Sequence, residues 1–100
     1  MNITKVVDND KTTIKLSGWL DTQAAPQLNE VMAELGQVKE LVLDFDEVEY
    51  MASSGLREVV AAYKKQSDEG NSFSVINVNS EIMSIFSMTK VDKKINISAK

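Results

Sequence analysis

The sequence contains no cysteine and no histidine. Without cysteine there is neither a disulfide nor a thiolate metal ligand, and without histidine there is no imidazole ligand. The same absences exclude catalytic pairs in which a histidine activates a serine or a cysteine. We therefore expect a protein that is not an enzyme and that holds no metal or other cofactor.

Long apolar runs and concentrations of positive charge are also missing. No apolar stretch approaches the about 20 residues that span a bilayer, and no secretory signal is visible. We therefore expect a soluble, cytoplasmic protein without direct membrane insertion. The formal net charge is -4 and the only basic doublets are Lys64-Lys65 and Lys93-Lys94. Because an acidic chain repels the phosphate backbone, we do not expect it to bind nucleic acid.

The length and composition are those of one small globular domain. The chain has 100 residues, of which 43% are hydrophobic and 26% are charged. These shares are ordinary for a soluble domain, and the length is too short for two. We therefore expect a single domain over residues 1–100.

Hydrophobic periodicity predicts strands that alternate with helices. Ile3–Val7 is expected to be a strand, and the alternating residues of Thr12–Ser17 predict a second one, so that the two together predict an opening hairpin. Apolar residues spaced by three or four predict the helices. The nearly continuous apolar run Leu41–Phe45 predicts a central strand covered on both faces, and Glu47–Met51 is expected to be a connection. The predicted elements are strands at 3–7, 12–17, 41–45, 73–78 and 95–97, and helices from about 22 to 35, from 53 to 65 and from 80 to 88.

This order, β-β-α-β-α-β-α-β, predicts an α/β fold with a mixed sheet, because an opening hairpin precedes parallel strands joined by helices. Several side chains are expected to end or cap the helices. Asp21 or Thr22 is the expected cap of the first helix, Gly36 its left-handed stop, and Asn79 or Ser80 the cap of the third.

The most informative stretch is Leu41–Lys65, in which a strand rich in acids leads to two serines and a glycine at the start of a helix. The first N–H groups of a helix have no partner within it and favour an anion. A phosphate on a serine there would add about -1.5 to -2 charges without unfolding the domain. Ser53 is the expected N-cap, and Gly55 would let another chain approach closely.

Plainer interpretations stand beside this one. A serine at a helix start is usually only a cap. Asp44 and Asp46 are more often solvated carboxylates than a metal pair, and Trp19 is more often a packing residue than a binding platform.

The ordered set of motifs resembles the STAS domain, which sulfate transporters and anti-sigma factor antagonists share. The resemblance runs over nearly the whole chain. It rests on Gly18-Trp19-Leu20-Asp21, on the strand Leu41–Phe45 with Val48 and Met51 after it, and on Ser53-Ser54-Gly55-Leu56. It implies the STAS-like arrangement of helices on a mixed sheet. Many members continue into a final helix, which we do not expect after Ile97-Ser98-Ala99-Lys100.

For the anti-sigma factor antagonists, the resemblance implies a partner-switching function. Such a domain binds an anti-sigma factor that is also a serine kinase, phosphorylation of one serine abolishes binding, and a serine phosphatase restores it. The corresponding residue here is Ser54, with Ser53 as the alternative, and Asp21 matches the loop acid near the phosphorylated serine. The partner-binding residues that this predicts are Asp21, Tyr50, Met51, Ala52, Ser53, Gly55, Arg57 and Glu58, with Ala61 on the same helix face.

One departure from the switch type keeps two alternatives open. Ala52 stands where those members usually have an aspartate that helps the kinase recognise the site. A stand-alone STAS adaptor subunit of a membrane complex, such as a lipid-trafficking ABC transporter, needs no such motif. The second alternative is a small nucleotide-binding or magnesium-dependent domain built on Asp21, Asp44 and Asp46. The absence of a glycine-rich phosphate loop and of histidine weighs against it.

Overall fold

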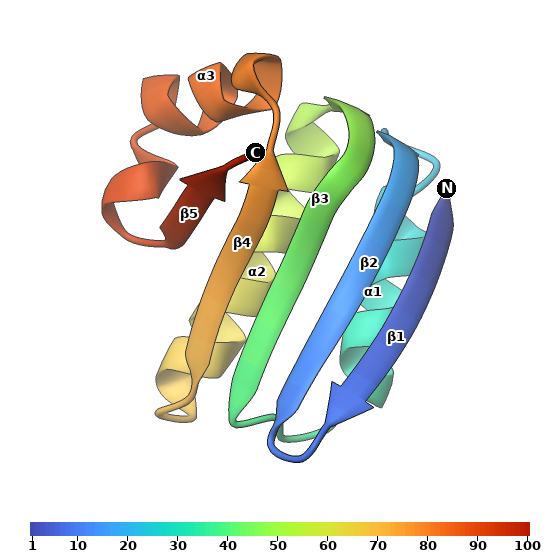
Figure 1. Cartoon of the computed structure of the whole chain (residues 1–100), viewed down its shortest axis with the longest axis vertical. Helices are drawn as coiled ribbons and strands as arrows, with labels where there is room; N and C mark the ends of the chain where they lie inside the picture. Colours follow the sequence, from blue (N-terminus) through green and yellow to red (C-terminus); the bar gives the residue numbers. More distant parts are fainter.

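The computed structural model describes residues 1–100 as a five-stranded sheet with helices packed against it (Figure 1). It confirms the mixed α/β class and the predicted order of strands and helices. None of its helices combines the length and the apolar character needed to cross a membrane. The elements are β1 (Asn2–Asp8), β2 (Lys11–Leu20), α1 (Ala25–Glu34), β3 (Glu40–Met51), α2 (Ser53–Asp68), β4 (Ser72–Val78), α3 (Ser80–Met88), the 3-10 turn η1 (Val91–Lys93) and β5 (Asn96–Ala99).

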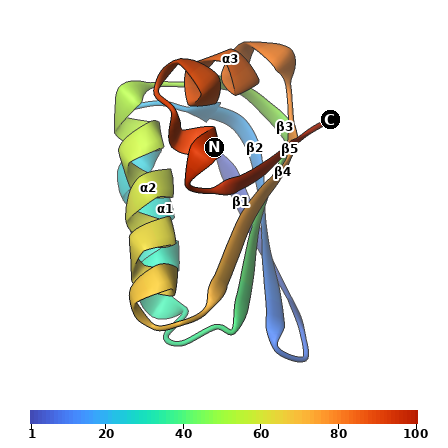
Figure 2. The ribbon, with the colours of Figure 1, turned by 90° about the vertical axis from the view of Figure 1, so that its left-hand side faces the viewer.

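The strands lie in the sheet in the order in which they follow one another in the chain, β1-β2-β3-β4-β5. β1 and β2 form the predicted antiparallel hairpin, and the three remaining pairs are parallel. Each parallel strand is added on the same side of the one before it. Because the crossovers between parallel strands are right-handed, connections that all run in this one direction place their helices on the same face of the sheet. Figure 2 shows α1 and α2 on the same face of the sheet, with α3 across its end. The opposite face carries no helix.

Two predicted strand boundaries were wrong. β3 continues to Met51, so residues 47–51 belong to a strand and not to a connection. β2 likewise continues through Gly18 to Leu20. The two strands stay paired as far as Leu20 and Met51 because shifts of register in β2 and β3 take up the residues that break the alternation.

The expectation that β3 is covered on both faces was also wrong. Its inward residues join a core of 20 buried residues between the sheet and the helices. Val42 points to the other face and is nevertheless only 4% exposed. Its sheet neighbours are Thr13 on β2 and Ser74 on β4. Burial of this central position therefore comes from the flanking strands and not from a second layer of helices.

The inward face of α2 differs from the stripe predicted by the apolar spacing of Leu56, Val59, Val60 and Tyr63. The helix buries Gly55, Val59, Ala62 and Gln66, whereas Leu56, Val60 and Tyr63 are only partly buried. Gln66 is 3% exposed. Its Nε2 donates hydrogen bonds to the carbonyl oxygen of Val38 at 2.8 Å and to that of Ser72 at 2.9 Å. The Gln66 amide thus joins the end of α2 both to Val38, just before β3, and to Ser72, the first residue of β4.

Asn79 and Ser80 were the two predicted caps of α3, and the structure shows that Asn79 is the cap. Its Oδ1 accepts a hydrogen bond from the N–H of Ile82 at 2.8 Å, and its Nδ2 donates to the carbonyl oxygen of Val48 at 3.1 Å. We expect Asn79→Ala to lower the free energy of unfolding by about 1–2 kcal/mol, because both bonds are lost. Urea unfolding would measure this, with exposed Ser80→Ala as the control. An equal loss in both variants would contradict the assignment.

Candidate functional site

The candidate site is the start of α2, beside the end of β2. The N–H of Ala52 donates to the carbonyl oxygen of Leu20 at 2.9 Å, which fixes the helix start to the sheet. Ala52 is the N-cap residue, and no side chain accepts a hydrogen bond at this helix start. The prediction that Ser53 is the N-cap was therefore wrong, because Ser53 is the first residue of the helix and is exposed. The first-turn N–H groups are left without a side-chain cap.

Ser54 lies in this first turn, half-buried, and its hydroxyl faces the loop that follows β2. Its Oγ is 3.3 Å from Oγ1 of Thr22. Sequence reasoning considered Thr22 only as a helix cap, since nothing in a linear sequence joins residues 32 positions apart. The contact brings the Gly18–Asp21 motif and the serine motif together in space.

Asp21 supports the loop that carries Thr22. Its Oδ1 accepts hydrogen bonds from the N–H groups of Gln23 at 3.1 Å and Ala24 at 2.9 Å. The N-cap of α1 is Ala24 and makes no side-chain cap bond, so Asp21 caps the turn before the helix and not the helix itself. The carboxylate of Asp21 is thus engaged in holding the loop that carries Thr22.

A shallow depression of about 430 Å³ lies between the first turns of α1 and α2. Across it, Nδ2 of Asn29 donates to Oε2 of Glu58 at 3.1 Å. The two ion pairs of the chain involve Lys39 and Lys100, so the exposed Arg57 guanidinium is in neither. The residues that line the depression are Thr22, Ala25, Pro26, Asn29, Glu30, Ser54, Arg57 and Glu58.

Two of the predicted partner-binding residues are buried. Met51 is 2% exposed and belongs to the core. Gly55 is also buried, and a Cβ built on it would lie 2.6 Å from Cγ and 2.7 Å from the carbonyl oxygen of Leu20. The expectation that Gly55 lets another chain approach closely was thus wrong, because the atoms packed against Gly55 belong to Leu20 of the same chain. The other predicted residues, Asp21, Tyr50, Ala52, Ser53, Ser54, Arg57, Glu58 and Ala61, are exposed or partly exposed.

Trp19 is not a packing residue of the interior. It lies opposite Tyr50 in the β2–β3 register, and the two ring centroids are 5.4 Å apart. The side chains are 59% and 46% exposed. Both rings point away from the core because their strand neighbours Leu20 and Met51 point into it.

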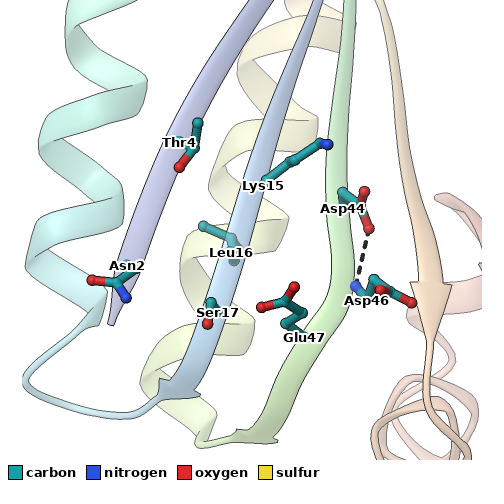
Figure 3. Close-up of a pocket in the computed structure, with 8 residues that line it drawn as sticks. All are labelled: Asn2, Thr4, Lys15, Leu16, Ser17, Asp44, Asp46 and Glu47. Carbon is teal, nitrogen blue, oxygen red and sulfur yellow. Dashed lines mark hydrogen bonds between the residues drawn. The ribbon is translucent and has the colours of Figure 1, made fainter.

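The acids considered for magnesium are not assembled into a metal site. Asp44 and Asp46 lie at a hollow of about 330 Å³ on the open face of the sheet (Figure 3). Oδ1 of Asp44 accepts hydrogen bonds from the N–H of Asp46 and from Nδ2 of Asn77, both at 3.0 Å. No group of three or more acidic side chains is close enough to hold a metal ion, so Asp21 does not complete this pair.

Comparison with known proteins assigns the family. Residues 3–97 match the family model described as "Mlab, STAS domain". The anti-sigma-B factor antagonist of Bacillus subtilis is 31% identical over 103 residues, covering 100% of this chain and 94% of that protein. The protein of the same name from Listeria monocytogenes is 32% identical, covering 97% and 90%.

Solved structures share the fold at lower identity. An anti-sigma factor antagonist from Mycobacterium paratuberculosis has a TM-score of 0.89 at 23% identity, covering 99% of this chain and 86% of that one. The Bacillus cell fate determinant SpoIIAA in its phosphorylated form has a TM-score of 0.77 at 17% identity, covering 99% and 93%. The chain therefore belongs to the STAS domain family and, over its whole length, is similar to the anti-sigma factor antagonists within it.

Proposed function

We propose that this domain binds an anti-sigma factor through the surface around Ser54, and that phosphorylation of Ser54 breaks the complex. The observation that carries the proposal is the position of Ser54 in the first turn of a 16-residue helix that has no side-chain cap. The names of the full-length relatives support the choice of partner. A structure of SpoIIAA in its phosphorylated form has the same fold, which supports the proposal that such a domain can be phosphorylated without unfolding.

The chemistry of the helix start favours a phosphate at this position. The uncapped N–H groups carry partial positive charge, and the Thr22 hydroxyl is already within 3.3 Å of the Ser54 Oγ. Arg57 follows three residues later, on the same side of the helix, and lines the same depression. A phosphoserine would therefore have donors around it and would not disturb the fold.

The same phosphate would oppose a bound partner. It would place about -1.5 to -2 charges in the middle of the proposed contact surface. If the partner offers no cation to the phosphate, burying that charge in the interface costs free energy. This cost far exceeds the binding free energy that a contact at the rim of the interface contributes. In this proposal the anti-sigma factor is itself the serine kinase, and a serine phosphatase restores binding. The domain serves as a regulated ligand and catalyses nothing.

The surface open to the partner follows from exposure. Ser53, Arg57 and Ala61 are exposed along α2, and Tyr50 is exposed just before it. Asp21, Ala52 and Glu58 are partly exposed beside them. Met51 and Gly55, being buried, support this surface from below.

Phosphate mapping tests the proposal. We expect incubation with ATP and an extract of the source cells to add phosphate to Ser54, as detected by mass spectrometry. Ser54→Ala should abolish the signal and Ser53→Ala should retain it. Ser54→Asp should weaken capture of the anti-sigma factor by at least about tenfold, because a fixed negative charge replaces the hydroxyl.

A second candidate function is that of an adaptor subunit in a membrane transport complex. Ala52 favours it, because an adaptor needs no acidic kinase motif beside the serines. A sulfate transporter family protein from Wolinella succinogenes has the same fold, with a TM-score of 0.81 at 13% identity. If Ser54 stays unmodified while the kinase phosphorylates another substrate, the proposed phosphorylation switch is overturned and the adaptor function is favoured.

A further inference from the structure

The exposed pair Trp19 and Tyr50 is unusual for this chain. The protein has one tryptophan and six aromatic residues in all. The three phenylalanines are buried, and Tyr63 is partly buried against Phe73. Only Trp19 and Tyr50 leave large aromatic surfaces in water, at 59% and 46% exposure. Tryptophan and tyrosine are enriched among the residues that dominate protein–protein binding energy, so this pair is a candidate anchor.

The surface beside the pair is acidic. A groove of about 620 Å³ runs over the end of β3 and the start of α3, and Gly18 and Glu49, the chain neighbours of Trp19 and Tyr50, both line it. Its charged lining consists of Asp46, Glu47, Glu49, Glu81 and Lys100. The one ammonium group is already occupied, because Nζ of Lys100 is 3.7 Å from Oδ1 of Asp46 and donates to the carbonyl oxygen of Asp46 at 2.6 Å. Three carboxylates are left without a cation.

We propose that Trp19 and Tyr50 anchor a positively charged segment of a protein partner, with an arginine or lysine side chain on the rings and further cations along the acidic groove. Cations are attracted to the faces of tryptophan and tyrosine, most strongly tryptophan. The neighbouring carboxylates complement the remaining charge of such a segment. The inference goes beyond the proposed function and does not depend on it, since it requires no modification of Ser54.

Charge also argues against other occupants. A second copy of this chain carries a net charge of -4 and would bring its own acids against the groove. A purely apolar helix would cover Glu47 and Glu49 without supplying a partner for either carboxylate. A basic segment supplies cations both to the faces of the two aromatic rings and to the carboxylates of the groove.

Trp19 is the only tryptophan, so its emission reports directly on this surface. The probe is a 12-residue peptide that alternates arginine and serine, and its counterpart carries glutamate in place of arginine. We expect the arginine peptide to change the Trp19 emission in a saturable way and the glutamate peptide to leave it unchanged. Tyr50→Ala should weaken binding about two- to fivefold, the range expected for one exposed cation–π contact.

A matched pair of double variants separates local charge from net charge. Glu47→Gln with Glu49→Gln removes two carboxylates at the groove. Glu34→Gln with Glu69→Gln removes two exposed ones where α1 and α2 end, at the other end of the sheet (Figure 1). The first pair should weaken the arginine peptide several-fold and the second should not. Equal weakening by both pairs, or equal binding of both peptides, would overturn the proposal. Ser54→Ala should bind the peptide normally, so this assay and phosphate mapping fail independently.

Discussion

Replacing Gly55 with alanine is expected to destabilise the fold by roughly 3 kcal/mol. In most helix interiors the same change stabilises by about 1 kcal/mol, because alanine is the better helix former. Here the new Cβ would lie 2.7 Å from the carbonyl oxygen of Leu20 and 2.6 Å from its Cγ. The side chain of Leu20 is fully buried and cannot move aside into water. The helix start would have to separate from β2, and the bond from Ala52 to Leu20 would be strained.

Urea unfolding measures this effect, and Ser67→Ala is the matched control. Ser67 is exposed on the same helix, so its replacement should change the free energy of unfolding by no more than about 0.5 kcal/mol. Adding Leu20→Ala should not rescue Gly55→Ala, because the backbone oxygen stays where it is. A Gly55→Ala protein as stable as the parent would show that the two segments are not in close contact.

Replacing Gln66 with glutamate is expected to cost about 3 kcal/mol at pH 7. The change hardly alters shape, but it removes the donor that serves two carbonyl oxygens, those of Val38 and Ser72. A carboxylate at this position would be buried and would face oxygens that repel it. The loss of stability therefore comes from charge and hydrogen bonding, not from packing.

The same variant should be strongly dependent on pH. Burial raises the pKa of the introduced carboxyl above its unfolded value of about 4.3. At a pH below the unfolded pKa the carboxyl group is protonated and neutral and can still donate one hydrogen bond, so most of the stability returns. As the pH rises through the folded pKa, stability is lost. Unfolding at pH 4 and pH 7, relative to the parent protein, would show this, whereas exposed Gln37→Glu should show no such difference. Equal losses at both pH values would contradict it.

Most of the fold could be predicted from local patterns. Alternation at Thr12–Ser17 and the spacing of apolar residues after Ala25 follow the periods of a half-buried strand and an amphipathic helix. The ends of β2 and β3 could not be predicted, because the register shifts between them interrupt the period at the point where the strands continue. The one-sided covering of the sheet follows from crossover direction, which no single element encodes.

The site was predictable in part. The serine motif placed Ser54 in the first turn of a helix, as the structure confirms. Its contact with Thr22 and the packing of Gly55 on Leu20 depend on how β2 and α2 meet, which spacing along the chain does not reveal. The exposure of Trp19 likewise depends on pairing, because it is set by which way β2 faces where it meets Tyr50.

The matching of sheet order to chain order has a consequence for how the protein is made. No strand is inserted between two others, so each strand joins a neighbour that has already left the ribosome. The sheet can be extended at one edge during synthesis, and each parallel addition closes only the short loop of a single helix crossover. β5, the fifth strand along the chain and only four residues long, is added at that edge.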